Sequence, residues 1–352
     1  MVAGGRARRR LDIPASWHGR RRTSRRQVTA YSLGVPTLKD PPQTASRPLV
    51  SVVIPVYNQG HYLAAAIESV LGQDYEPLEL VVVDDGSTDS SSDVLRGYSD
   101  RITIIRQPNR GAANALNRGI DAAQGELVCW LSADDQFRPG KIGAQVAAFA
   151  ADADLWLCAT GYDVVDARDR LIRRLPEPSW RHPDAFVAVF WQNPINGSSV
   201  MVRREVFDRL GSFDTTLRAD VDGEMWLRIA PHGRIGQIDG SYLRYRVHDR
   251  SLSANRALMV ESMTRVRVPY VADGTLRGRL EGDRRAAAIL AQMSAEYGWR
   301  GYRELAEALL RESRALGSAR PSQWLADLVR LVTRWQAGRR IARRQRESLR
   351  GG

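Results

Sequence analysis

Between residues 49 and 159 the chain alternates short apolar runs with segments of helical periodicity, and this alternation constrains the fold more than any other feature. Five runs have the length and composition of buried strands: residues 52–56, 80–83, 102–105, 127–131 and 155–159. Strands that alternate with helices predict an α/β domain with a largely parallel sheet and helices on both faces. Ligands of such sheets bind beyond the carboxyl ends of the strands, so ligand contacts are expected in the loops after Val56, Val83 and Leu131.

Further elements are expected from local signals. Pro139 suits the first turn of a helix that continues to about Phe149, because proline loses no helical hydrogen bond at that position. Residues 201–202 indicate a short strand, and residues 222–230 indicate a helix with one apolar side. The last hundred residues are expected to be mostly helical.

The charge of the chain concentrates at its two ends. The 352 residues carry a formal net charge of +12, with arginines clustered in residues 6–26 and 334–350. Residues 1–48 combine this charge with Ser, Thr, Pro and Gly and lack periodicity, which predicts a disordered basic arm. An ordered domain over residues 49–250 and a helical region with a basic amphipathic tail over residues 251–352 are expected to follow.

The location of the protein is predicted from what the sequence contains and lacks. No stretch approaches the length of a membrane-spanning helix, and the arginine-rich start has no apolar segment of a secretory signal. Cys129 and Cys158 lie in apolar runs and indicate buried thiols. We therefore expect a cytoplasmic protein. The helix from Gln323 is expected either to pack on the domain or to lie peripherally on the inner, anionic face of a membrane.

Acidic side chains follow two of the predicted strands directly. Asp84 and Asp85 come after the second strand, and Asp134 and Asp135 come after the fourth. Carboxylates at a buried strand end are costly unless they meet a partner, and carboxylate oxygen is a ligand that Mg²⁺ and Mn²⁺ prefer. Taken alone, each loop is also compatible with a solvated turn or a helix cap.

Four segments, taken in order, resemble the inverting enzymes of glycosyltransferase family 2. They are SVVIPVYN at Ser51–Asn58, VVVDDGSTD at Val81–Asp89, the glycine-punctuated segment Asn109–Gly119, and WLSADD at Trp130–Asp135. The resemblance covers about residues 49–250 and implies a catalytic domain there. It also implies the GT-A fold, an α/β architecture with a mixed, mostly parallel sheet flanked by helices, here with a helical C-terminal extension.

The resemblance implies a nucleotide site at the first three segments. Seven residues are expected to bind the nucleotide: Pro55, Val56, Tyr57, Asn58, Asp84, Asp85 and Asn117. The residues from the first strand would line the pocket largely through their backbone. Asp84 would hold the base, Asp85 would support the loop, and Asn117 would lie near the sugar of the donor.

The resemblance implies a divalent metal, Mg²⁺ or Mn²⁺, beside the donor diphosphate. Asp134 matches the ligating carboxylate of the family's Asp-x-Asp element, but Ser132 stands where the element usually begins with Asp. Asp135 could compensate for the missing carboxylate. His248, in the segment Tyr245-Arg246-Val247-His248, is expected to contact the metal or the diphosphate, and Arg246 to neutralise the diphosphate.

The resemblance also implies a general base at the start of the predicted helix 222–230. The segment DVDGEMWLR matches the family's acidic helix start and places Asp222 on the usual Asp. An inverting transfer needs one carboxylate that removes the proton of the acceptor hydroxyl, and a helix N-terminus favours the ionised form. Asp222 could instead be a helix cap, with Asp220 as the alternative base. Asn196 is expected beside the acceptor channel.

The predicted function is a metal-assisted inverting transfer from a nucleotide diphosphate sugar, with a UDP-sugar as the first choice, to an acceptor hydroxyl on a glycan, a lipid-linked molecule or a protein. One alternative is a sugar nucleotidyltransferase, but the loop after the first strand lacks the glycine-rich basic character usual in those enzymes. A second alternative is a basic nucleic-acid-binding protein without catalysis. No recognised nucleic-acid-binding motif is present, so no specific nucleic acid is expected as a partner.

Overall fold

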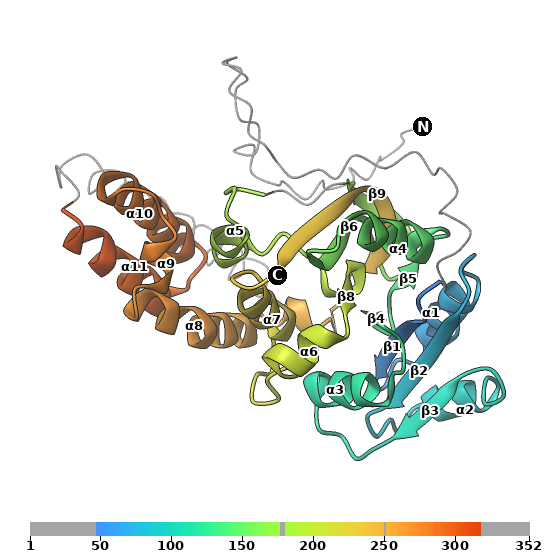
Figure 1. Ribbon diagram of the computed structural model, residues 1–352. Coiled ribbons are helices and arrows are strands. Elements are labelled where there is room, and N and C mark those ends of the chain that lie inside the picture. Colours follow the sequence, from blue (N-terminus) through green and yellow to red (C-terminus); the bar gives the residue numbers. More distant parts are fainter. Residues whose placement is uncertain (1–46, 177–179, 250, 318–352) are drawn as a thin grey trace, which may run out of the picture.

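The computed structural model describes residues 47–176, 180–249 and 251–317 (Figure 1). The predicted basic arm lies outside the described residues except for its last two positions, and the amphipathic tail from Gln323 lies outside them entirely. Within the described ranges, no helix is both long and apolar enough to cross a membrane. The same ranges form a nine-stranded mixed sheet with helices packed against it.

The first half of the sheet consists of four parallel strands in the order β3-β2-β1-β4. They are β1 (Val50–Val56), β2 (Leu78–Asp84), β3 (Thr103–Arg106) and β4 (Leu127–Trp130), and they confirm four of the predicted strands. The apolar run of β1 is continuous because both of its faces are covered: Val52 and Ile54 contact one core, and Val53 between them contacts the other.

Four helices accompany this half of the sheet, and one of them begins later than predicted. They are α1 (Gly60–Leu71), α2 (Ser91–Arg96), α3 (Ala112–Ala122) and α4 (Lys141–Ala151). The first turn of α4 was predicted at Pro139, but the helix begins two residues later. Gly140 precedes it in the left-handed conformation and Arg138 N donates to Tyr242 O at 2.8 Å, so Pro139 lies in the connection from the sheet.

The second half of the sheet changes direction at β4. The strands are β5 (Gln136–Phe137), β6 (Leu155–Val165), β7 (Leu171–Leu175), β8 (Met201–Arg203) and β9 (Arg234–Arg246). The order continues β4-β8-β6-β9-β5, with β7 paired to β6, and only β6 and β9 run parallel. The strands expected at 155–159 and 201–202 are therefore present, within an arrangement that mixes both directions.

The C-terminal helices share a core with this second half. The helices after β7 are α5 (Ala185–Gln192), α6 (Glu205–Leu210), α7 (Val221–Ile229), α8 (Arg256–Ala272), α9 (Thr275–Gly278), α10 (Asp283–Trp299) and α11 (Arg303–Ala315). Figure 1 shows α8 to α11 beside α5 and α7, on the side of the molecule away from β3. One continuous apolar cluster joins Phe190 of α5, Trp226 of α7 and Leu290 of α10.

Candidate active site

The loops after β1 and β2 are tied to each other at the carboxyl edge of the sheet. Asn58 N donates to Ser87 Oγ at 3.1 Å, and Thr88 N donates to Asn58 Oδ1 at 2.8 Å. Asn58 has a φ of 53°, a left-handed conformation that asparagine tolerates better than most residues. Tyr57 is half exposed next to this contact. The backbone of the predicted nucleotide loop is therefore held in one shape by the loop that carries Asp84.

Asp84 is buried at the end of β2 and accepts hydrogen bonds from the protein itself. Ser87 N donates to Oδ1 at 2.8 Å, and Arg106 Nε and Ser92 Oγ donate to Oδ2 at 3.0 and 3.3 Å. A nucleotide base would therefore have to share this carboxylate with Ser87, Ser92 and Arg106. The role of Asp84 in holding the base stays a prediction.

Asp85 supports a loop, as the resemblance implied. Its Oδ1 accepts from Gln107 Nε2 and Arg110 N at 2.8 and 2.9 Å, and its Oδ2 accepts from Gly111 N at 2.8 Å. One buried carboxylate thus orders the chain that leads into α3.

Asn117 does not present its amide to a ligand in this structure. Asn117 Nδ2 donates to Phe213 O, and Phe213 N donates to Asn117 Oδ1, both at 2.9 Å. This reciprocal pair joins α3 to the connection before α7. The side chain holds backbone in this structure, which favours a structural role for Asn117 over the predicted contact with the donor sugar.

The predicted metal residues meet across the sheet edge. Asp134 Oδ2 lies 2.9 Å from His248 Nε2, although the two residues are 114 positions apart. Their side chains are 15% and 11% exposed, so the pair is largely enclosed but still open to solvent. Tyr62 of α1 stacks on the His248 ring, with 5.6 Å between ring centroids.

The fit of a divalent cation to this pair follows from the donor set. Within the part of the chain that the structure describes, no group of three or more His, Cys, Asp or Glu side chains is arranged to hold a metal. Mg²⁺ and Mn²⁺ sites that carry nucleotide phosphates commonly use only one or two protein ligands, and the phosphates complete the shell. Asp134 and His248 fit a metal that binds together with its substrate.

Asp135 faces inward and does not replace the missing carboxylate at Ser132. Ser198 Oγ donates to Asp135 Oδ2 at 2.6 Å, and Arg246 N donates to Asp135 Oδ1 at 2.8 Å. Burial first, and then the neighbouring Asp134, raise the pKa of Asp135 well above its usual value. Asp135 therefore ties three segments together, and the exposed Ser132 is left with its hydroxyl 3.3 Å from Ser198.

Arg246 was predicted to neutralise the diphosphate, but in the structure its guanidinium binds groups of the protein itself. Its side chain is 2% exposed. Arg246 donates to Asp134 O, Asp166 O and Asp169 Oδ1 at 2.8, 3.0 and 2.7 Å, and it lies 4.6 Å from the centroid of the Tyr62 ring. The guanidinium is committed to these contacts and fixes the backbone beside Asp134.

Asp222 lies in the first turn of α7, next to the turn that precedes β8. A Cβ added to Gly197 would lie 3.2 Å from Asp222 Oδ2 and 3.1 Å from Trp130 Nε1, so backbone passes closely by this carboxylate. Asn196 accepts the hydrogen bond of Ser198 N at 2.9 Å and shapes that turn. Through residues 196–198, Asp222 is connected to the loop that carries Asp134.

The protonation of Asp222 is displaced toward neutral pH. Burial is the largest cause and the charge of Asp220 the second, and together they raise the pKa of Asp222 to about 6. A carboxylate whose pKa approaches the working pH is a better general base than one of ordinary pKa. Asp220, the alternative base, is ion-paired with Arg267 and buried.

Sequence reasoning missed the aromatic residues that bring these elements together. Trp130, at the end of β4, stacks on Trp226 of α7 with 5.6 Å between centroids, and Phe213 meets the Trp130 ring edge-on. The Tyr62 ring likewise contacts both the Arg246 guanidinium and the His248 ring. The only local signal was the position of a tryptophan directly before an acidic loop.

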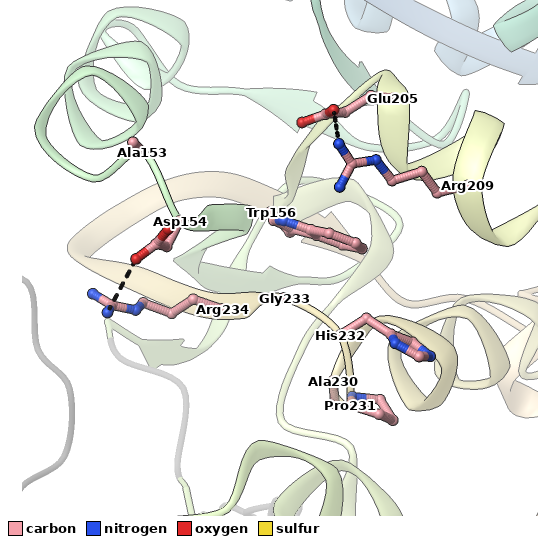
Figure 2. A pocket seen from close by; sticks show the side chains of 10 residues that line it. All are labelled: Ala153, Asp154, Trp156, Glu205, Arg209, Ala230, Pro231, His232, Gly233 and Arg234. Atoms are coloured by element: carbon pink, nitrogen blue, oxygen red, sulfur yellow. Dashed lines mark ion pairs between the residues drawn. The ribbon is translucent and has the colours of Figure 1, made fainter.

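A surface hollow lies elsewhere on the molecule. It has a volume of about 550 Å³ and is formed by the start of β6, α6 and the turn between α7 and β9 (Figure 2). Figure 2 shows Trp156 between the ion pairs Glu205–Arg209 and Asp154–Arg234. This hollow is next to the C-terminal end of α7, whereas Asp222 lies at its N-terminal end, so the hollow is not the acidic site.

The mixed sheet with acidic residues at its carboxyl edge has the GT-A fold, and comparison with a solved structure agrees. A crystal structure of Staphylococcus aureus TarS, residues 1–349, in complex with UDP-GlcNAc has a TM-score of 0.52 at 15% sequence identity. The match covers 76% of this chain and 90% of that chain. At this identity the likeness shows the fold alone.

The sequence comparisons identify the family. The sequence model of the family described as "Glycosyl transferase family 2" matches residues 51–211. A putative teichuronic acid biosynthesis glycosyltransferase, TuaG of Bacillus subtilis, is 31% identical over 220 residues, which cover 60% of this chain and 83% of that protein. An uncharacterised glycosyltransferase of Rickettsia typhi is 30% identical over 220 residues, covering 61% and 69%. The chain therefore belongs to glycosyl transferase family 2.

Other relatives are longer than the matched region. In an uncharacterised glycosyltransferase of Rickettsia felis, the match is 34% identical but spans only 34% of that protein's length. Membership of this family favours a glycosyltransferase over the two alternatives, a nucleotidyltransferase and a non-catalytic nucleic-acid-binding protein.

Proposed function

We propose that this enzyme transfers a glycosyl group from a nucleotide diphosphate sugar to an acceptor hydroxyl by one displacement that inverts the anomeric centre. The observation that carries the proposal is the placement of Asp222. This carboxylate has a raised pKa, lies beside Gly197, and is joined through that turn to the loop of Asp134. A base and a diphosphate-binding pair at one sheet edge are what an inverting transfer needs.

In the proposed reaction, Asp222 accepts the proton of the acceptor hydroxyl while the hydroxyl oxygen attacks the anomeric carbon. The bond from that carbon to the diphosphate breaks on the opposite side, and the nucleotide diphosphate leaves with the bonding electrons. An α-linked donor then gives a β-linked product. The N-terminus of α7 stabilises the ionised form of Asp222 before the acceptor arrives.

The proposed metal pair acts on the leaving group. Asp134 and His248 would hold Mg²⁺ or Mn²⁺, which supplies positive charge beside the diphosphate as the bond breaks. The protein keeps this pair in register through Arg246, which binds the backbone of Asp134, and through Tyr62, which packs on His248.

The proposed donor is a UDP-sugar. The TarS structure with the same fold holds UDP-GlcNAc, which makes this donor the first to test. The proposed acceptor is a hydroxyl of a glycan, of a lipid-linked molecule or of a protein. Cytoplasmic location and peripheral contact with an anionic membrane are part of the same proposal.

The decisive test uses Asp222→Asn with Asp214→Asn as the matched control. Asp214 lies in the connection before α7 and is partly exposed. Asp222→Asn should reduce kcat by at least about a hundredfold, since general base catalysis contributes about 10²–10⁴. Donor affinity in calorimetry should stay within about twofold. Full activity of Asp222→Asn would contradict the assignment of the base.

The metal pair is tested separately by donor binding. Asp134→Ala and His248→Ala should each weaken binding of UDP in the presence of Mn²⁺ and leave the weaker metal-free binding unchanged. The effect expected for loss of one ligand is about tenfold or more. Equal losses with and without the cation would mean that the two residues bind the nucleotide or hold the fold, and do not bind metal.

A further inference from the structure

A buried ion pair connects the C-terminal helices to the start of α7. Arg267 of α8 is fully buried, and its Nη1 lies 2.5 Å from Asp220 Oδ2. Arg267 Nε donates to Phe190 O in α5 at 3.2 Å. Tyr297 of α10 donates its hydroxyl hydrogen to the same carbonyl. Three helices therefore meet around Arg267, whose carboxylate partner Asp220 is the residue that precedes α7.

Asp220 is itself in an unusual position. It is the N-cap of α7 in the left-handed conformation, with a φ of 55°, which is costly for a residue other than glycine. Its carboxylate lies over the first turn: a Cβ added to Gly223 would lie 2.3 Å from Asp220 Oδ1. The chain thus keeps a strained aspartate in contact with the turn that carries Asp222, and Arg267 is the cation that holds it.

We propose that Arg267 is a positioning residue for the base, and that the C-terminal helices complete the active site by fixing the first turn of α7 through Asp220. The proposal rests on the proposed role of Asp222. In it, Arg267 touches neither donor nor acceptor. It holds the Asp220 carboxylate in place through their ion pair, and Asp220 in turn sets the position and the charge environment of Asp222.

The charges that face Asp222 make this role measurable. From α7 the facing charge is Asp220, which raises the pKa of Asp222, and from α8 it is Arg267, which lowers it by a smaller amount. From β4 and the 196–198 turn the neighbours are Trp130 and Gly197, which carry no charge. Removing both members of the ion pair should therefore lower the pKa of Asp222.

A purely structural role is the competing explanation, and the chain offers a matched control. Arg279, at the end of α9, forms a similar ion pair of 3.2 Å with Asp184, which caps α5. Both arginines dock the C-terminal helices on an N-cap aspartate, but only the Arg267 partner lies beside the base. Arg279→Met should lower the melting temperature and leave kcat per folded molecule unchanged.

The experiment measures kcat, donor KM and the pH profile of full-length Arg267→Met, Arg267→Lys and the double variant Asp220→Asn/Arg267→Met. In Arg267→Met, kcat per folded molecule should fall between about tenfold and a hundredfold, the range expected when a reacting group is misplaced. Donor KM should stay within about twofold. Arg267→Lys keeps the charge and should recover part of the kcat.

The double variant removes the buried charge pair as a unit, which proteins often tolerate, so it keeps the proposal testable if Arg267→Met does not fold. Its acidic limb should move to lower pH than that of the wild type, so that more of the plateau activity remains at pH 5. The wild type should keep about one-tenth there, because its base has a pKa of about 6.

Two results would overturn the inference. One is an acidic limb in the double variant that stays at the wild-type position. The other is an Arg267→Met variant that loses stability as Arg279→Met does but keeps its kcat. Failure of the proposed function is separate, because it would appear as full activity in Asp222→Asn, whatever the Arg267 variants show.

Discussion

Replacing Asp222 by Asn is expected to stabilise the fold while it removes activity. A carboxyl group whose pKa is raised to about 6 in the folded protein, from an ordinary 3.8, holds its proton more tightly folded than unfolded. The cost to the folded state is therefore absent below about pH 4, grows between about pH 4 and 6, and is complete above pH 6. Asn carries no charge at any of these pH values and avoids the cost.

The size of the effect follows from the structure. The difference between 3.8 and about 6 corresponds to about 3 kcal/mol, since one pKa unit is worth about 1.4 kcal/mol. The carboxylate is only partly buried by its surface exposure, so the measured gain should be smaller, about 1–2 kcal/mol at pH 8. Asn at this position can still accept the hydrogen bond of Gly223 N, which is 2.9 Å long.

Urea unfolding of the wild type and of Asp222→Asn at pH 8 and at pH 4 measures this difference. The variant should have the higher free energy of unfolding at pH 8, and the two proteins should converge at pH 4. Asp214→Asn is the control, and it should lower the free energy of unfolding at pH 8. The hydroxyl of Thr216 lowers the pKa of Asp214, so the ionised form of this carboxylate stabilises the fold. A gain in Asp222→Asn that does not change with pH, or no gain at pH 8, would refute the reasoning.

Three further predictions follow from the same geometry. Between its plateau and pH 5, kcat/KM of the wild type for the acceptor should fall about tenfold as Asp222 takes up a proton, measured with a pH-rate profile. Asn117→Ala should lower the free energy of unfolding by about 1–3 kcal/mol, because it leaves the N–H and C=O of Phe213 without their side-chain partner, and donor KM should not change in initial-rate assays. Gly119→Ala should cost about 1–3 kcal/mol in urea unfolding, because its Cβ would lie 2.3 Å from Val53 Cγ1, which is fully buried.

The sequence alone determined the framework of this protein. The apolar runs located the strands that became β1 to β4, β6 and β8, and the central strands β1 and β4 are apolar almost throughout because both of their faces are buried. The acidic residues that follow β2 and β4 were located at one edge of the sheet because the carboxyl ends of parallel strands lie at the same edge. The resemblance identified the family, and the structure brings Asp134 and His248 together, while their binding of a metal stays a prediction.

Only the tertiary structure decided which polar residues face the site and which serve the fold. Three polar residues have side chains suited to ligand binding, yet each forms hydrogen bonds with groups of the protein that are distant in sequence. They are Asn117, Asp135 and Arg246. Asp220 and Asp222 are only two residues apart, yet the structure uses them differently. Arg267 of α8 forms its ion pair with Asp220 and not with Asp222. A sequence pattern records spacing along one segment, whereas the protonation and availability of a side chain depend on burial and on charges that other segments bring.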